Sequence, residues 1–316
     1  MSERAQPVAL VLRALGLGDF FTGLPALAML RRALPDHHVV LAVPRQFTPL
    51  VRLAGTVDAV VHGHELEPLV DAPQRPEIAV DLHGNGPASR QLLLDCAPRR
   101  LVAFGLDGPM WRDDEHEVTR WCRLISEGLP APHVPVPAIA GALPVPLGIA
   151  APPGLTVLHC GAKAKARQWL PERFAALAAH LQAAGHRVAI SAGPGEEQLG
   201  RSIAAASGAR VLDSVSLLML LAIIASARLV VSGDTGVAHV ATNYRTPSVV
   251  LFGPVSPAIW GPPPDPRHQV LWRAEGRGDP HGDTPDPALL AITVSEVAAA
   301  CERALAGAEL AMAYGG

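Results

Sequence analysis

The stretch that decides the fold lies at residues 229–239 and reads LVVSGDTGVAH. Its apolar beginning is typical of a strand buried on both faces of a parallel sheet. The small residues that follow predict a tight turn into a helix. Gly233 and Gly236 would let backbone N–H groups approach a ligand closely, because glycine has no side chain. The helix N-terminus and the hydroxyl of Thr235 would then suit a phosphate group.

Two interpretations of this turn are open. In the first it binds an anion, and His239 faces the same ligand because it lies about one helical turn after Thr235. In the second Asp234 only caps the helix, and His239 is a packing residue. Taken alone, the stretch favours the second interpretation, so its surroundings must decide between them.

Outward from this turn, the second half of the chain alternates strand and helix. Pro171 is expected to begin a helix that ends before Gly185, the usual places of these two residue types. Ser295 is expected to cap the last helix. Strands are expected at 155–159, 187–191, 211–212, 229–232 and 248–252, and 248–252 is the last clear strand. Helices are expected at 171–184, 196–207, 216–227, 234–242 and 295–306.

The first half shows the same alternation, with strands expected at 8–12, 39–43, 57–61, 78–82 and 101–104, and helices at 22–34, 89–95 and 118–126. Between the halves, residues 130–153 hold eight prolines and little periodicity, which is typical of a linker. The sequence therefore predicts an α/β protein with two Rossmann-like doubly wound domains of parallel sheet, 1–145 and 146–316. The last helix is free to pack back on the first domain. In such sheets ligands bind outside the carboxyl ends of the strands, so we expect one cleft between the domains.

Composition narrows the possible functions. The chain has 316 residues, is 49% hydrophobic and 17% charged, and carries a net charge of −3. These values exclude a disordered chain, and aromatic residues at 4% argue against single-stranded nucleic acid as a partner. Four cysteines without a C-x-x-C spacing fit reduced thiols. The longest apolar run has nine residues, 217–225, whereas a membrane span needs about 20. We expect a cytoplasmic protein without a transmembrane segment, with peripheral contact at the inner face of the membrane left open.

Three cations follow the strand at 155–159. Lys163, Lys165 and Arg167 occupy alternate positions of a loop that begins at a carboxyl strand end. Arg167 could bind a diphosphate through two parallel hydrogen bonds, and the lysines could add point charge. A solvated loop is the alternative, but the expected position beside Asp234 favours phosphate.

The loop after the first strand reads ALGLGD at 14–19. It has Gly16 and Gly18 but no third glycine at the dinucleotide spacing, and no acidic residue ends the second strand, so a nicotinamide oxidoreductase is disfavoured. A carboxylate on a loop that lines a cleft suits a general base, which makes Asp19 the candidate. The alternative is that Asp19 caps the helix that begins near Phe20.

Other polar residues give weaker signals. His83 and Asn85, in the loop after the strand at 78–82, could line the acceptor side of the cleft or form only a turn. The histidine pairs His37/His38 and His62/His64 lack the remaining ligands of a metal site. We therefore expect no metal.

Seven segments, in this order, form a specific set: LGLGD at 15–19, GLPAL at 23–27, DLHG at 81–84, HCG at 159–161, RQWLP at 167–171, SGDTGVAH at 232–239 and FGP at 252–254. Together they resemble glycosyltransferase family 9, the ADP-heptose–lipopolysaccharide heptosyltransferases. The resemblance spans most of the chain and implies the two-domain GT-B fold.

The resemblance also implies an activity. The protein would move a heptose-like sugar from an ADP-sugar to an acceptor hydroxyl in a single inverting displacement, with Asp19 as the base. The sugar nucleotide is then a co-substrate, and no cofactor or metal is implied. The donor domain would be 146–316 and the acceptor domain 1–145.

The residues of the donor site carry over one by one. Asp234, Thr235, Gly236 and His239 match the donor-binding segment of the family, and Ser216 matches a segment near the adenine and ribose. The family has a lysine before its Trp-Pro pair, whereas here Arg167 stands nearest that place and Leu170 separates Trp169 from Pro171. Which of Lys163, Lys165 and Arg167 contacts the diphosphate is therefore open. On the acceptor side the candidates are Gly18, His83 and Asn85; the match there is poor, and the acceptor is either a glycolipid or a small molecule.

Two alternatives stay open beside the transferase. One is a sugar-nucleotide epimerase or hydrolase of the same fold, which would need no acceptor. The other is a non-catalytic protein that binds a sugar nucleotide. Asp19 disfavours the latter, because a binding protein has no need of a base.

Overall fold

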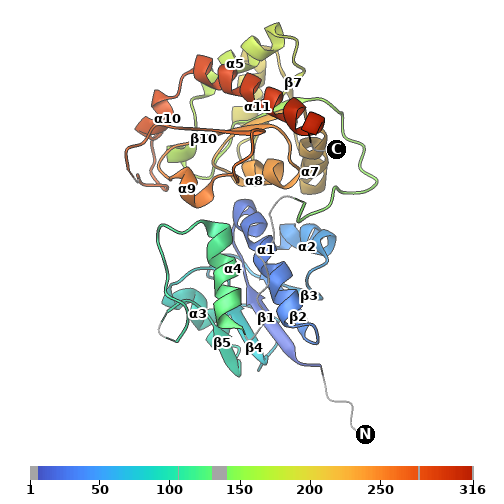
Figure 1. Cartoon of the computed structure of the whole chain (residues 1–316), viewed down its shortest axis with the longest axis vertical. Helices are drawn as coiled ribbons and strands as arrows, with labels where there is room; N and C mark the ends of the chain where they lie inside the picture. Colours follow the sequence, from blue (N-terminus) through green and yellow to red (C-terminus); the bar gives the residue numbers. More distant parts are fainter. Residues whose placement is uncertain (1–5, 106, 130–140, 277, 315–316) are drawn as a thin grey trace. The chain divides into compact units, whose positions relative to one another are not determined.

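The computed structural model describes residues 6–105, 107–129, 141–276 and 278–314. It divides into two compact units, Met1–Pro144 and Val145–Gly316. Of the proline-rich stretch expected to be the linker, residues 130–140 lie outside the described part. Each unit is an α/β structure built on its own parallel sheet (Figure 1).

The first unit has five strands in the order β3-β2-β1-β4-β5, with every neighbouring pair parallel. In Figure 1, α1 and α4 lie side by side over one face of this sheet. On the other face, Leu92 and Leu93 of α3 pack against Leu10 and Leu12 of β1. The elements are β1 (Val8–Leu12), α1 (Leu17–Ala33), β2 (His38–Val43), the 3-10 turn η1 (Arg45–Phe47), α2 (Thr48–Ala54), β3 (Ala59–His62), β4 (Ile78–Asp81), α3 (Pro87–Leu94), β5 (Arg100–Val102) and α4 (Glu117–Gly128).

The second unit has six parallel strands in the order β11-β10-β9-β6-β7-β8. Its elements are β6 (Thr156–His159), the 3-10 turn η2 (Lys165–Arg167), α5 (Pro171–Ala183), β7 (Val188–Ser191), α6 (Glu197–Ser207), β8 (Arg210–Val211), α7 (Leu217–Ser226), β9 (Leu229–Gly233), α8 (Gly236–Asn243), β10 (Ser248–Phe252), α9 (Pro257–Trp260), β11 (His268–Trp272), α10 (Pro287–Ala291) and α11 (Val294–Tyr314).

Helices cover both faces of this second sheet. Leu158 and Val231 face α5, α6 and α11 in one core, whereas Val250 packs against Ala238 of α8 on the opposite face. This alternation follows from the two-residue period of a strand. Trp169 anchors the larger core: it is 2% exposed, its ring meets Phe174 edge-on, and its Nε1–H donates to the carbonyl of Ile292 at 3.0 Å.

Both sheets have a point where the strand order reverses, and ligands bind outside the carboxyl ends of strands at such points. In the first unit the point lies between β1 and β4, where Leu12 is in register with Asp81. In the second it lies between β6 and β9, where His159 is in register with Ser232. The loops singled out from the sequence begin at these four strand ends.

The doubly wound fold is confirmed, while several boundaries differ. Helix α1 begins at Leu17, five residues before the expected start, because Gly16 takes the N-cap position and Asp19 closes the first turn. Strand β11 follows 248–252, the last clear strand expected from the sequence. It is an edge strand with an irregular burial pattern and lacks the continuous apolar run of the others. Helix α2, also missed, has only seven residues and begins with a proline in its first turn.

The last helix begins one residue before the expected start, and its cap is Thr293, not Ser295. The hydroxyl of Thr293 accepts a hydrogen bond from the Glu296 N–H at 3.3 Å, and the Glu296 carboxylate accepts one from the Thr293 N–H at 2.8 Å. This is a reciprocal capping box. The helix contacts α5 and strands β9 to β11 of its own unit.

We expect Thr293→Ala to lower the free energy of unfolding by about 1 kcal/mol, a loss of about 2–4 °C in melting temperature. Ser295→Ala is the matched control, because Ser295 is exposed and does not cap the helix; it should change stability by less than about 0.5 kcal/mol. Thermal melts followed by circular dichroism measure both. Equal losses in the two variants would contradict the assignment of the cap.

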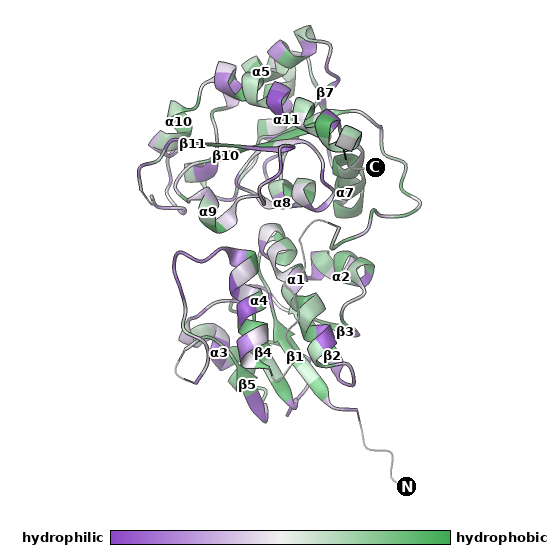
Figure 2. Cartoon of the chain, in the orientation of Figure 1, coloured by the Kyte–Doolittle hydropathy of each residue, from purple (hydrophilic) through white to green (hydrophobic). Residues whose placement is uncertain are grey.

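Helix α7 contains the longest apolar run, and Figure 2 shows its ribbon green along almost its whole length. Residues 221–224 are buried, as expected for a helix that packs inside a domain, whereas residues 217–220 of its first turn are only half-buried. None of the helices in the described part of the chain combines the length and the apolar character that a membrane crossing needs.

Candidate active site

The turn after β9 is not a simple helix cap. Thr235, and not Asp234, holds the N-cap position of α8, and its side chain makes no capping hydrogen bond. The Thr235 Oγ1 is buried and has no hydrogen-bond partner among the described residues, and the same holds for the Oγ of Ser232. The Asp234 N–H donates to the Leu251 carbonyl at 3.1 Å, which ties the turn to β10. A buried hydroxyl without a partner is costly unless a ligand or water satisfies it.

The cationic loop after β6 lies directly against this turn. The Arg167 carbonyl oxygen lies 3.0 Å from the position that a Cβ on Gly233 would occupy, and the Ala166 carbonyl lies 3.2 Å from that of Gly253. Glycines at the ends of β9 and β10 therefore allow the loop to cross both strand ends. The structure thus brings together two segments that the sequence separates by more than sixty residues.

The three cations of this loop differ in their surroundings. Lys163 and Lys165 are exposed, whereas Arg167 is half-buried. The Nε of Arg167 is buried without a hydrogen-bond partner among the described residues. Arg167 thus combines a positive charge with an unsatisfied donor beside a turn that carries an unsatisfied hydroxyl. This combination suits an anion with several oxygen acceptors.

Glu196 holds the cationic loop in place, and sequence reasoning missed it. One carboxylate oxygen accepts hydrogen bonds from the Ala162 N–H at 2.9 Å and from the Gln168 side-chain amide at 3.2 Å. The other accepts the Gly193 N–H at 3.1 Å. A Cβ on Gly161 would collide with this carboxylate. A signal was available, because Glu196 follows β7 at the same sheet edge as the loops that were singled out.

Two other residues predicted for the donor site have local structural contacts. His239 is 5% exposed, and its ring meets the Trp260 ring edge-on at a centroid distance of 5.9 Å. Ser216 caps α7, and its hydroxyl accepts a hydrogen bond from the Met219 N–H at 3.2 Å. Gly236 is the first residue of α8.

Asp19 lies in the first turn of α1 and serves as a capping residue. One of its carboxylate oxygens accepts a hydrogen bond from the Gly16 N–H at 3.2 Å. The other lies 3.8 Å from Nη2 of Arg13, and the side chain is 28% exposed. Asp19 thus supports the cap from the third helical position, whereas the alternative had it cap a helix that begins near Phe20; its side chain stays partly exposed.

Arg13 is a second residue that the sequence did not reveal. Its guanidinium donates to the carbonyls of Asp19 (2.6 Å) and Leu82 and to the hydroxyl of Thr22 (3.0 Å). It also stacks on the Trp121 ring, with 4.7 Å between Cζ and the ring centroid. Burial lowers the pKa of Arg13 to about 10, against the opposing effect of nearby carboxylates. The group therefore stays charged at neutral pH.

The loop after β4 lies beside Arg13 and Asp19. Nδ1 of His83 accepts the Ala14 N–H at 3.3 Å, which leaves the proton of the neutral ring on Nε2. Burial, followed by the charge of Arg13, lowers the pKa of His83 to about 4, so the ring is neutral at pH 7. Asn85 is exposed, and its backbone carbonyl accepts a hydrogen bond from Arg90 at 3.0 Å.

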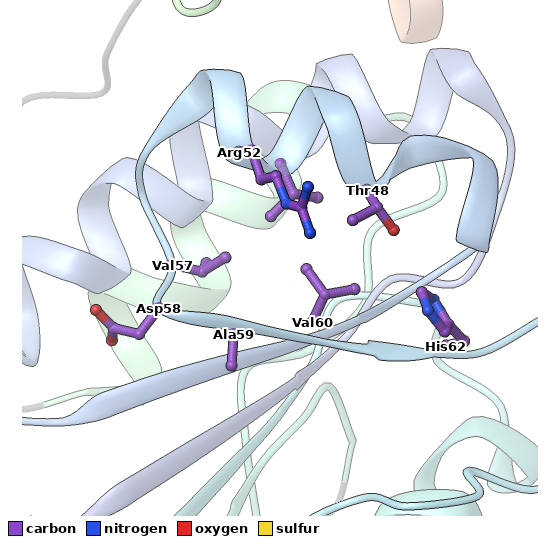
Figure 3. A pocket seen from close by; sticks show the side chains of 8 residues that line it. Thr48, Arg52, Val57, Asp58, Ala59, Val60 and His62 are labelled. Atoms are coloured by element: carbon purple, nitrogen blue, oxygen red, sulfur yellow. The ribbon is translucent and has the colours of Figure 1, made fainter.

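Figure 3 shows a separate pocket of about 250 Å³ in the first unit, where Arg52 and Thr48 reach from α2 toward Val60 on β3. It contains none of the residues predicted for a site. Within the described residues, no group of three or more His, Cys, Asp or Glu side chains could hold a metal ion.

Comparison with known proteins identifies the family. The model of glycosyltransferase family 9 (heptosyltransferase) matches residues 110–282, which is more than half of the chain. These residues include the cationic loop and the turn after β9, whereas Asp19, His83 and Asn85 lie before the matched range. Lipopolysaccharide heptosyltransferase 1 of Pseudomonas aeruginosa is 32% identical over 111 residues; the match spans 34% of this chain and only 31% of that protein.

Solved structures share the fold. E. coli ADP-heptose lipopolysaccharide heptosyltransferase II superposes with a TM-score of 0.75 at 18% identity, covering 96% of this chain and 99% of that one. An E. coli heptosyltransferase solved with ADP gives 0.73 at 20% identity, covering 94% and 99%. The two parallel-sheet units thus have the GT-B fold of these enzymes. The chain belongs to glycosyltransferase family 9, the heptosyltransferase family.

Proposed function

We propose that this protein transfers a heptose-like sugar from an ADP-sugar to an acceptor hydroxyl, with inversion at the anomeric carbon and with Asp19 as the general base. The observation that carries the proposal is the pair of unsatisfied buried donors, Thr235 Oγ1 and Arg167 Nε, at the point where the second sheet reverses its strand order. A related heptosyltransferase has been solved with ADP and with an ADP-2-deoxy-2-fluoro heptose, which supports ADP as the nucleotide.

The donor diphosphate binds in the second unit, Val145–Gly316. Arg167 and the start of α8 neutralise the negative charge that grows on the diphosphate as its bond to the sugar breaks. Lys163 and Lys165 add positive charge from the same loop. Asp234, Gly236, His239 and Ser216 complete the donor site. In this scheme the leaving group is stabilised by cations and backbone N–H groups, so the transfer uses neither a metal nor a cofactor.

The acceptor binds to the first unit, Met1–Pro144, beside Gly18, His83 and Asn85. The carboxylate of Asp19 takes the proton from the acceptor hydroxyl as that oxygen attacks the anomeric carbon. The bond between the anomeric carbon and the diphosphate oxygen breaks on the opposite side, and ADP leaves. In this scheme the donor and the acceptor bind to different units. The acceptor is a glycolipid or a small molecule with a free hydroxyl, met in the cytoplasm or at the inner face of the membrane.

The proposal is tested first by a donor panel. ADP-, GDP- and UDP-sugars are added to the protein, and its thermal stability is measured. We expect ADP-heptose to stabilise it by about 2.7 kcal/mol at a concentration 100 times the dissociation constant, and the GDP- and UDP-sugars to have little effect. Stabilisation by UDP- or GDP-sugars alone would contradict the choice of nucleotide.

The second test follows the fate of the donor. ADP-heptose is incubated with the protein, with and without a lipopolysaccharide preparation that lacks heptose, and the products are resolved by phosphorus NMR and mass spectrometry. Transfer predicts rapid ADP release only when the acceptor is present, with a new glycoside of inverted configuration. Rapid hydrolysis or epimerisation of ADP-heptose without an acceptor would contradict the transferase proposal and indicate a sugar-nucleotide hydrolase or epimerase. Tight binding of ADP-heptose without turnover would indicate a binding protein.

A further inference from the structure

We infer that Arg13 is a positioning residue for the transfer reaction: a buried cation that holds the Asp19 turn and the His83 loop in one fixed relation. The inference rests on the proposed role of Asp19 as the base. Arg13 itself is 2% exposed, so it acts through the groups that it holds.

The contacts of Arg13 join the turn at Asp19 to Leu82, which lies 69 residues after Arg13 in the sequence. Nε donates to the Asp19 carbonyl, which also accepts the Thr22 hydroxyl at 3.2 Å. Nη2 donates to that same hydroxyl, and Nη1 donates to the Leu82 carbonyl, next to His83. One rigid, planar group therefore sets the separation between the first turn of α1 and the loop after β4.

The fold is built around this side chain. A Cβ on Gly23 would lie 2.6 Å from Nε of Arg13 and 2.8 Å from its Cδ, so residue 23 of α1 must be glycine for the guanidinium to fit. A glycine inside a helix costs about 1 kcal/mol relative to alanine. The ring of Trp121, from α4, also packs on the guanidinium.

Packing alone does not require a charged side chain at position 13. Burying a cation costs several kcal/mol, and an apolar side chain of similar volume often packs as well or better. What an apolar side chain cannot do is donate to the Asp19 and Leu82 carbonyls together. Arg13 also places a positive charge 3.8 Å from the Asp19 carboxylate. Its function is therefore to fix the geometry and the charge surroundings of the base, and a displacement of about 1 Å at a reacting group can cost 10²-fold in rate.

The experiment compares Arg13→Met, which removes the charge, with Arg13→Lys, which keeps it but cannot form the same fork of hydrogen bonds. Arg123→Met is the matched control, because Arg123 also stacks on an aromatic ring of this unit, Phe104, but does not contact either loop. Turnover is measured as ADP release from ADP-heptose with heptose-free lipopolysaccharide. We expect kcat to fall about 100-fold in Arg13→Met and less in Arg13→Lys, with the ADP dissociation constant within about twofold of wild type. The kcat of Arg123→Met should lie within about twofold of the wild-type value.

Hydrogen exchange gives a second measurement that does not depend on turnover. In Arg13→Met, amide protection should be lost together at 14–22 and at 82–86, whereas Asp19→Asn should keep the protection of 82–86. A wild-type protein that transfers nothing would contradict the proposed function, while the exchange data would still test the link between the loops. Folded Arg13 variants with wild-type kcat, or with both segments still protected, would overturn the inference. If Arg13→Met does not fold, the kcat of Arg13→Lys and its amide protection at 14–22 and 82–86 test the inference instead.

Discussion

Asp19→Asn should lower kcat for sugar transfer about 10³-fold and leave ADP binding unchanged, because general base catalysis typically contributes 10²–10⁴-fold. The substitution is well suited to the site. An asparagine oxygen can still accept the Gly16 N–H that caps α1, so the first turn of the helix is preserved while the basic oxygen is lost. The measurement is the steady-state rate of ADP release with acceptor, alongside calorimetric titration with ADP.

Asp36→Asn provides the control, since Asp36 is an exposed carboxylate of the same unit in the turn before β2. It should keep full turnover. Near wild-type kcat in Asp19→Asn would show that another group takes the proton. Loss of ADP binding in the same variant would instead indicate a defect of folding.

Arg167→Met should weaken ADP binding about 10- to 100-fold. Hydrogen bonds to charged groups contribute about 1.5–3 kcal/mol each, and every 1.4 kcal/mol is a factor of about ten in affinity. Arg167 is the cation of its loop with a buried, unsatisfied Nε, whereas Lys163 and Lys165 are exposed. Changing either lysine to methionine should therefore weaken ADP binding only a few-fold. Calorimetric titration of the three variants with ADP ranks the cations.

The matched control for this series is Arg201→Met on α6, where the arginine pairs with Asp213 at 3.0 Å on the surface. It should bind ADP like the wild type. A larger loss in a lysine variant than in Arg167→Met would reassign the diphosphate contact to that lysine. Unchanged affinity in all three variants would mean that the loop after β6 is not the phosphate site.

The sequence was sufficient to predict the alternation of strands and helices, because continuous apolar runs and flanking glycines or prolines are local signals. It also predicted that the cationic loop and the turn after β9 belong together, since both follow buried strands of one parallel sheet. The structure confirms this proximity through Gly233, where a side chain would meet the Arg167 carbonyl.

What the sequence could not show depends on contacts between distant segments. Arg13 follows an apolar strand and has no local pattern of its own; its importance arises from Leu82 and Trp121, which other elements deliver. Glu196 is likewise defined by hydrogen bonds to a loop about thirty residues earlier. Strand β11 was missed because an edge strand is covered on fewer sides and so needs fewer apolar residues.

Each unit has its own sheet, its own core and its own point of strand reversal. The residues of each core therefore come from one unit alone. Under the proposed division of substrates, preference for the donor and preference for the acceptor can change in separate evolutionary steps. A lineage that keeps the loops after β6 and β9 can acquire a new acceptor by altering only the loops after β1 and β4. An engineered chimera could likewise combine the donor unit of one relative with the acceptor unit of another.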